Sequence, residues 1–183
     1  GISTQVTKCR SLLLEPFCLI GRGSTFQDRH YFSETEFRRD VLRIRLYYWK
    51  RGYRDTEVDT AVVRTGPRAV RVTFDVHENQ PTTIRKISIS YDSTLISGKI
   101  RDRLTLLRAK DPLDLIVLDS MRVLFQNELW DRGYGDATVD TSVVVDTATK
   151  LADVGLLLTN NRITTVGRVT VRGAERVDVA TIR

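Results

Sequence analysis

Residues 49–60, WKRGYRDTEVDT, return 81 positions later as residues 130–141, WDRGYGDATVDT. With Val62 and Val63, which return as Val143 and Val144, ten identities share this offset. A second set recurs at an offset of 82 and comprises Thr82, Thr83, Ile100 and Arg101. Repetition at a fixed period marks an array of one supersecondary unit. A catalytic site duplicated whole is uncommon, so the repeat favours a modular binding array over an enzyme.

The length of 183 residues holds about two such units and the start of another. We expect residues 1–81 to form a unit that lacks its first strand. Residues 82–163 are expected to form a complete unit, and residues 164–183 the opening of a further one. Both ends of the sequence are therefore expected to fall inside a unit. No apolar run of transmembrane length and no signal peptide is present in the sequence.

The second copy predicts the order of elements. Residues 86–90 alternate polar and apolar side chains, as a half-buried strand does. An apolar stripe at helical spacing follows, and Asp111 and Pro112 predict the N-cap and first residue of a second helix. Gly133 stands where a left-handed C-terminal cap is needed. Two alternating strands follow on either side of a turn at residues 147–150. The unit is therefore strand, helix, helix, strand, strand, which is an α+β fold.

The first copy repeats this order with other local signals. Ser33 and Glu36 form a capping box at the start of a helix, and Gly52 ends it. A hairpin follows, with its turn at residues 65–68. Residues 1–10 are typical of the end of a short helix, and residues 11–29 form a long insert between the helices. Val166, Val169 and Val171 predict the first strand of the third copy.

Charge and metal-ligand content exclude several kinds of site. The net charge is +6, but the 29 basic residues are interspersed with 23 acidic ones, which is typical of a solvated surface. Cys9 and Cys18 are spaced for a small loop disulfide or for two free thiols. His30 and His77 are the only histidines, and neither is near a cysteine. We therefore expect no metal site and no cofactor.

Two other functional classes, RNA-binding modules and enzymes, lack their sequence motifs here. The element order and the basic charge also suit an RNA-binding module of the KH type, which needs a G-x-x-G loop between its helices. No two glycines lie three positions apart, so we expect no nucleic-acid partner. An enzyme is disfavoured because the sequence has no G-x-S-x-G, P-loop or H-E-x-x-H motif and no cysteine–histidine pairing.

The motif W-x-R-G-Y-x-D-x-x-V-D-T at both junctions resembles the helix-to-strand junction of POTRA (polypeptide-transport-associated) domains in BamA-like outer-membrane assembly proteins. The resemblance covers essentially the whole chain. It implies tandem βααββ units, each a three-stranded mixed sheet covered by two helices. One departure is the segment 9–29, which is longer than the usual connection between the two helices.

The resemblance also implies location and partners. These are the periplasmic side of a Gram-negative outer membrane, unfolded outer-membrane polypeptides, accessory periplasmic lipoproteins and a C-terminal membrane β-barrel in the parent chain. Exposure to the periplasm would make a Cys9–Cys18 disulfide possible. A TamA-like or two-partner secretion transporter remains the alternative within the same family.

Two sets of residues are candidate sites. If the sheet order is first, third, second strand, as the family implies, the second strand of each unit is an open edge that can accept an extended peptide. This edge comprises Val58, Thr60, Val62 and Val63 in one copy and Val139, Thr141, Val143 and Val144 in the other. A structural junction, with a possible hinge role, comprises Trp49, Gly52, Tyr53, Trp130, Gly133 and Tyr134.

Overall fold

The computed structural model describes residues 2–6, 8–9, 27–28, 30–67 and 69–171. The chain divides into two compact units. The first comprises Gly1–Thr83, Lys110–Ile116 and Asp146–Leu151, and the second comprises Ile84–Ala109, Val117–Val145 and Ala152–Arg183.

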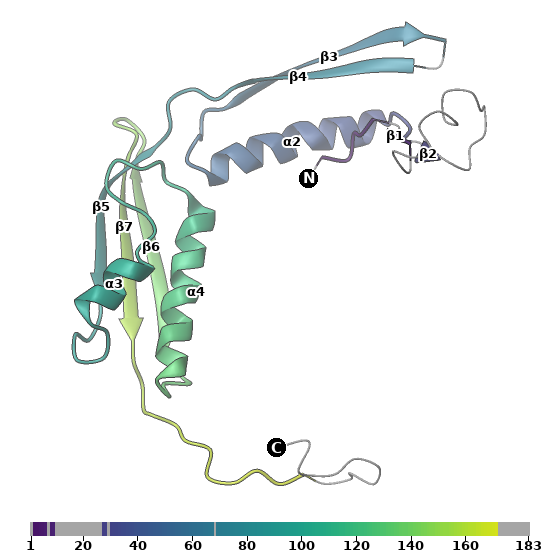
Figure 1. The fold of residues 1–183 in the computed structure, drawn as a ribbon. Helices are drawn as coiled ribbons and strands as arrows, with labels where there is room; N and C mark the ends of the chain where they lie inside the picture. The colour runs from purple at the N-terminus through teal and green to yellow at the C-terminus, as the bar shows by residue number, and fades with distance from the viewer. Residues whose placement is uncertain (1, 7, 10–26, 29, 68, 172–183) are drawn as a thin grey trace. The chain divides into compact units, whose positions relative to one another are not determined.

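The first unit is built on one long helix beside a β-hairpin (Figure 1). Its elements are β1 (Lys8–Cys9), β2 (Gln27–Asp28), α2 (Glu34–Lys50), β3 (Glu57–Gly66) and β4 (Ala69–His77). β1 pairs with β2, and β3 pairs with β4, both in antiparallel fashion. The β3–β4 register shifts at a bulge between Arg64 and Gly66.

Aromatic packing joins the helix of the first unit to its hairpin. The Phe37 ring of α2 lies 5.2 Å from the Phe74 ring of β4, centroid to centroid, and Phe37 is buried. Ser33 caps the helix, since its hydroxyl accepts a 3.4 Å hydrogen bond from the Glu36 amide. The Glu36 carboxylate pairs with Arg39 and Arg43. One half of the expected capping box is thus present, and the carboxylate half turns to arginines.

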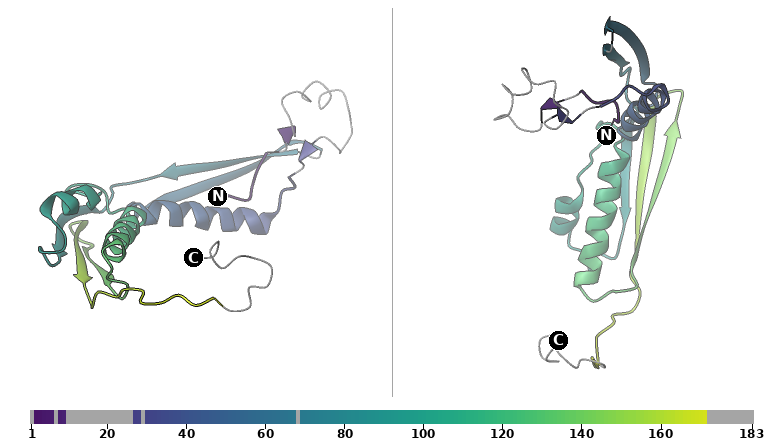
Figure 2. Two further views of the ribbon diagram at one scale, coloured as in Figure 1. Left: turned by 60° about the horizontal axis from the view of Figure 1, so that its bottom comes forward. Right: turned by 90° about the vertical axis from the view of Figure 1, so that its right-hand side faces the viewer.

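The second unit is an α+β layer with a three-stranded sheet. Its elements are β5 (Thr83–Ser90), α3 (Gly98–Leu104), α4 (Leu115–Asp131), β6 (Thr138–Asp146) and β7 (Leu151–Thr159). The sheet order is β5-β7-β6, which is the expected order of first, third and second strand. β5 and β7 run in one direction and β6 in the other, so the sheet is mixed (Figure 1). Figure 2 shows α3 and α4 on the same face of this sheet.

The core of the second unit lies between the sheet and these two helices. Alternate residues of β7 face it, and the buried side chains of α4 recur at helical spacing. The fully buried large side chains of this core include Ile84, Ile96, Met121, Phe125, Leu129, Val154 and Leu156. Arg85 on β5 also holds Asp153 on β7 through two hydrogen bonds of 2.9 and 2.5 Å. This unit therefore confirms the predicted α+β class, with a mixed sheet covered by two helices.

The repeat is visible in the element bounds. α2 and α4 each have 17 residues. They begin at Glu34 and Leu115, which are 81 positions apart, and β3 and β6 begin at Glu57 and Thr138, also 81 apart. β4 and β7 begin 82 positions apart. The sequence offset is thus an offset of whole elements.

Three local predictions differ from the structure. α4 begins at Leu115 and not at Pro112, because Pro112 is drawn into a β-bridge with Thr83. Asp114 accepts a 2.8 Å hydrogen bond from the Ile116 amide and caps the helix in place of Asp111. Residues 2–6 are not helical, and residues 160–171 form no strand. A strand needs a partner for its ladder of hydrogen bonds, and no partner strand lies beside 160–171 in the part of the chain that the structure describes.

Candidate functional site

The two candidate edge strands are β3 and β6. Among the described residues, β6 is the outer strand of its sheet and pairs only with β7, and β3 pairs only with β4. An outer strand presents unpaired backbone N–H and C=O groups along one side, which can form the ladder of an added strand. The structure thus places both candidate segments at sheet edges.

Along each edge strand the side chains divide between the core and solvent. Val58 and Val139 are buried and anchor the strand starts. Beyond them most side chains are exposed, with Val63 at 56% and Val144 at 69% of full exposure, whereas Val143 and Val145 are half-buried. Thr60 and Thr141 are exposed as well. Each edge therefore combines open backbone with an apolar side chain that faces water.

The first unit has a second open edge that the sequence reasoning did not single out. β4 corresponds to β7, which is flanked by β5 on one side and β6 on the other. In the part of the chain that the structure describes, β4 pairs with β3 alone. This edge could have been predicted from the sequence, because a unit that lacks its first strand leaves its third strand without one neighbour. Strand addition must therefore be tested at two edges in each unit, β3 and β4 in the first and β5 and β6 in the second.

The helix-to-strand junction has the same backbone geometry in both copies. Gly52 and Gly133 have φ of 94° and 88°, in the left-handed region that favours glycine. The next amides, of Tyr53 and Tyr134, donate back to the carbonyls of Tyr48 and Leu129 at 3.0 and 3.1 Å. These bonds satisfy carbonyl groups that the helix end leaves without partners.

The aromatic residues of the junction divide into two kinds. The Tyr53 ring packs edge-on against the Tyr48 ring, with centroids 6.1 Å apart. Trp49 and Trp130 are 39% and 51% exposed, so neither is a core residue. The sequence pattern shows on which face of its helix each tryptophan lies, but it does not show whether another element covers that face.

A pair of hydrogen bonds ties the segment that follows each hairpin back to the junction. The Thr82 amide donates to the Gly52 carbonyl at 2.8 Å, and the Thr164 amide donates to the Gly133 carbonyl at 2.9 Å. Asn79 Nδ2 donates to the Asp55 carbonyl at 2.8 Å, and Asn161 Nδ2 donates to the Asp136 carbonyl at 2.7 Å. Sequence reasoning missed the asparagines, although they too recur at an offset of 82.

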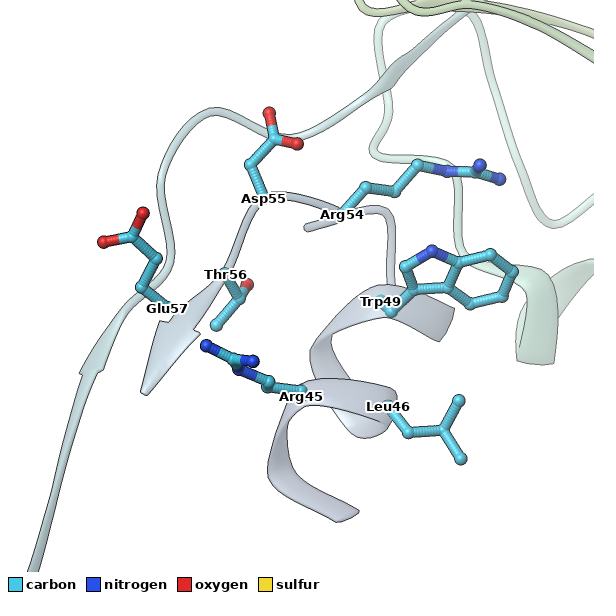
Figure 3. Close-up of a pocket in the computed structure, with 7 residues that line it drawn as sticks. All are labelled: Arg45, Leu46, Trp49, Arg54, Asp55, Thr56 and Glu57. Atoms are coloured by element: carbon cyan, nitrogen blue, oxygen red, sulfur yellow. The ribbon is translucent and has the colours of Figure 1, made fainter. Parts of the chain in front are cut away.

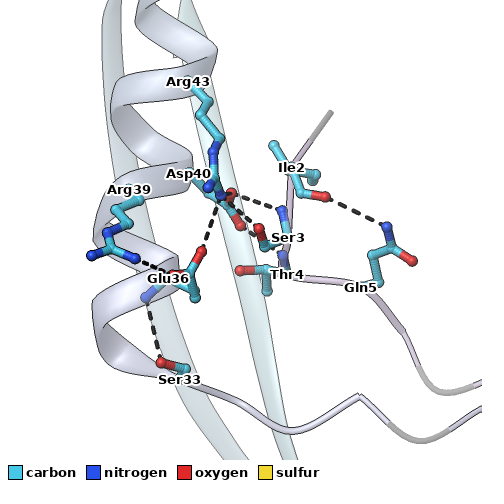
Figure 4. A network of polar contacts seen from close by, with 9 residues as sticks. All are labelled: Ile2, Ser3, Thr4, Gln5, Ser33, Glu36, Arg39, Asp40 and Arg43. Atoms are coloured by element: carbon cyan, nitrogen blue, oxygen red, sulfur yellow. Dashed lines mark hydrogen bonds and ion pairs between the residues drawn. The ribbon is translucent and has the colours of Figure 1, made fainter.

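A buried carboxylate holds the N-terminal segment against α2 (Figure 4). Asp40 is fully buried, and its two oxygens accept hydrogen bonds from the amides of Ser3 at 2.8 Å and Thr4 at 2.6 Å. Arg43 Nη1 donates to Asp40 Oδ1 at 2.6 Å and to the Ser3 hydroxyl at 2.6 Å. Burial raises the pKa of Asp40, but the hydrogen bonds from Thr4, Ser3 and Arg43 outweigh it and hold the pKa well below its usual range.

The remaining site predictions concern metals, membranes and the disulfide. No cluster of metal-ligating side chains occurs among the described residues. In that same part of the chain, no helix combines the length and apolar character that crossing a bilayer requires. Cys18, the partner proposed for Cys9, lies outside the described residues.

Comparison with known proteins agrees with this geometry. A family model described as "POTRA: Surface antigen variable number repeat" matches residues 20–79. A crystal structure of Haemophilus influenzae BamA POTRA3-5 is 25% identical to this chain, with a TM-score of 0.54, over 87% of this chain and 61% of the other. The chain carries a POTRA domain of a BamA-like protein.

Two cyanobacterial structures are similar to this POTRA chain at lower scores. The N-terminal domain of Omp85 from Thermosynechococcus elongatus is 18% identical with a TM-score of 0.39, over 81% of this chain and 58% of the other. POTRA1-2 of the periplasmic domain of Omp85 from Anabaena is 18% identical with a TM-score of 0.38, over 84% and 88%. The POTRA chain spans 61% of the length of the Haemophilus influenzae structure.

Proposed function

We propose that this chain is the POTRA region of an outer-membrane protein-assembly factor, located on the periplasmic side of the outer membrane. Its units receive unfolded outer-membrane polypeptides and dock accessory periplasmic lipoproteins, ahead of a membrane β-barrel in the same protein. The domain boundaries that go with this proposal are 1–81, 82–163 and 164–183. The chain acts by binding and carries out no reaction of its own.

The observation that carries the proposal is the position of β6 in the sheet. Its outer side has no partner among the described residues, and Val144 on it is exposed. An extended segment that adds to β6 gains hydrogen bonds from the backbone, which carry no side-chain code. This mode of binding suits a receptor for many unrelated unfolded sequences. Among the described residues β3 pairs only with β4, which supports a second such edge in the first unit.

The charge pattern of the edge strands favours apolar segments of a substrate. β6 carries Asp140 and Asp146 near its ends, and Val143, Val144 and Val145 lie between them. An added strand with alternating apolar residues would place some of these side chains beside Val144 on the exposed face. Strands of outer-membrane barrels alternate in this way, with apolar side chains on the lipid face.

NMR titration tests the proposal. A peptide taken from an outer-membrane barrel strand is added to the ¹⁵N-labelled 183-residue chain up to millimolar concentration. We expect amide shifts along β6 and β3. A TamA-like or two-partner secretion transporter would use the same edges but bind segments of secreted substrates more tightly. A peptide from a secreted passenger protein is therefore titrated in parallel. Shifts confined to α2, α3 and α4 would contradict strand addition.

A further inference from the structure

The outward face of α2 carries an apolar stripe that faces water. Leu42, Leu46 and Trp49 are 63%, 51% and 39% exposed. Their spacing of four and three residues places them on one side of the helix. The stripe extends about 10 Å along the axis, or two turns. Phe37 and Asp40 are the buried residues of α2 and define its inner face, so this stripe contributes nothing to the core of the unit.

Leu46 and Trp49 of this stripe form one wall of an open hollow (Figure 3). The other wall is the chain from Arg54 to Glu57, which leaves the helix and enters β3. The hollow has a volume of about 630 Å³ and is lined by Arg45, Leu46, Trp49, Arg54, Asp55, Thr56 and Glu57. Figure 3 shows Leu46 and Trp49 projecting from the same side of the helix, with the Arg54 side chain beside the Trp49 ring.

The charges around the hollow are unevenly matched. The Asp55 carboxylate is paired with Lys150 of the same compact unit at 2.7 Å. The Arg54 guanidinium lies 4.7 Å from the centre of the Trp49 ring, and Arg54 Nε has no hydrogen-bond partner in the described part of the chain. Arg45 is exposed and makes no ion pair with another described residue. Two cations therefore flank the apolar stripe without a carboxylate of their own.

The second unit shows that the fold does not require this chemistry. At the same places in the repeat, Arg45 becomes Gln126, Leu46 becomes Asn127 and Arg54 becomes Gly135. Gln126 is buried there and donates a 2.5 Å hydrogen bond to the Ala137 carbonyl. The second unit keeps exposed apolar residues at two places of the stripe, Val123 and Trp130, but forms the same helix, junction and strand without Leu46 and the two arginines. Folding therefore does not require Leu46, Arg45 or Arg54.

We propose that the surface formed by Leu42, Leu46, Trp49, Arg45 and Arg54 docks a helix of a partner protein that carries acidic residues beside an apolar stripe. A helix face offers no unpaired backbone, so its partner is recognised through side chains. Two turns of apolar contact match a helix packed along α2, with its acidic residues against Arg45 and Arg54. This inference rests on the proposed function only in that it names a docking site for an accessory protein.

An anionic membrane surface is the competing occupant, and the hollow disfavours it. Glu57 and Asp55 stand on the rim beside the two arginines. A flat layer of anionic headgroups would meet these carboxylates and could not enter the hollow. A helix can direct its acidic residues to the arginines and leave the rim carboxylates in water.

The test measures binding of a designed helical peptide to the 183-residue chain in a Trp130→Phe background, so that fluorescence reports Trp49. The probe has 18 residues, leucines at helical spacing and flanking glutamates; a control peptide has lysines in place of the glutamates. We expect the glutamate peptide to change the Trp49 emission and the lysine peptide to bind at least about tenfold more weakly. An emission that neither peptide changes overturns the proposal.

Substitutions to the residues of the second unit are expected to preserve the fold, because that unit carries them at the same places in the repeat. Leu46→Asn is expected to lower the affinity for the glutamate peptide about tenfold. Arg45→Gln with Arg54→Gly is expected to lower this affinity too, by a factor that is smaller at high salt because salt already screens the charges in the parent. The charge-matched control, Lys99→Gln with Arg168→Gln, should bind as the parent does. Equal loss in this control overturns the proposal, as does binding only to phosphatidylglycerol vesicles.

The barrel-strand peptide is titrated against the same variants. If the parent chain binds the barrel-strand peptide but not the glutamate peptide, only this inference is refuted. If the parent chain does not bind the barrel-strand peptide, the proposed function is refuted.

Discussion

The Thr82 amide donates a 2.8 Å hydrogen bond to the carbonyl oxygen of Gly52. Thr164 and Gly133 repeat this bond at 2.9 Å, 82 and 81 positions later. In both copies the segment that leaves the hairpin is therefore fixed to the glycine that ends the preceding helix. The carbonyl is available because the left-handed glycine turns the chain out of the helix.

Substitution of the two glycines is expected to have unequal cost. A Cβ at position 52 would lie 2.8 Å from the Leu113 nitrogen and 3.2 Å from the Thr82 carbonyl oxygen. Within 4 Å of a Cβ at position 133 lies only the Cγ2 methyl group of the exposed Ile163 side chain, at 3.3 Å. Both variants carry the cost of a left-handed alanine, about 1 kcal/mol, and Gly52→Ala adds a backbone clash.

Urea unfolding measures this difference. Trp49 reports the first unit in a Trp130→Phe background, and Trp130 reports the second in a Trp49→Phe background. We expect Gly52→Ala to lower the free energy of unfolding of its unit by about 3 kcal/mol and Gly133→Ala by about 1 kcal/mol. An equal loss in the two units would show that the Leu113 contact does not constrain position 52.

Asn79 combines a left-handed backbone, with φ of 58°, and a side-chain bond to the Asp55 carbonyl. Asn79→Gly keeps the backbone freedom and removes the hydrogen bond, whereas Asn79→Ala removes both. We expect losses of about 1 kcal/mol for glycine and about 2 kcal/mol for alanine in the free energy of unfolding of the first unit. A larger loss for glycine than for alanine would contradict this assignment.

Asp40 makes the first unit sensitive to acid. Its pKa in the folded protein is depressed, so its carboxylate stabilises the fold above the pKa of the unfolded chain, near 4. That contribution is lost as pH falls below about 4 toward the folded pKa. At pH 7 we expect Asp40→Asn to destabilise the first unit by about 2 kcal/mol.

The pH dependence separates the charge of Asp40 from its shape. Urea unfolding of the parent and of Asp40→Asn is compared at pH 7 and at pH 3. The difference between them should shrink at the lower pH, because Asp40 of the parent takes up a proton in the unfolded chain but stays ionised in the folded protein, where Ser3, Thr4 and Arg43 donate to it. A difference that stays constant across this range would mean that ionisation of Asp40 contributes nothing.

The sequence predicted the elements that repeat. Gly52 and Gly133 end their helices, the second hairpin turn lies at residues 147–150, and the order β5-β7-β6 agrees with the family, whereas β3 continues through Gly66 into the turn predicted at residues 65–68. These features can be predicted from local signals, such as a glycine at a helix end and alternating apolar residues in a strand, and from the internal repeat of the sequence.

The features that were missed depend on tertiary contacts. Pro112 would suit the first turn of a helix, but its bridge to Thr83 delays α4 to Leu115. A charged residue such as Asp40 is expected on the solvent-exposed face of a helix. It is buried because Ser3 and Thr4 pack over it and donate hydrogen bonds to it. The exposure of Trp49 and Trp130 follows from the absence of a covering element among the described residues, which periodicity cannot report.

Strand addition at the outer edge of β6 is the central claim, and adjacent prolines test it most directly. Consecutive amides of a strand point to opposite sides, so one of Val143 and Val144 donates outward and the other toward β7. Val143→Pro and Val144→Pro are each titrated with the barrel-strand peptide, and folding is followed by the amide spectrum. One variant should stay folded and lose peptide binding, and the other should disrupt the sheet. A folded proline variant that binds the peptide as tightly as the parent would contradict the account.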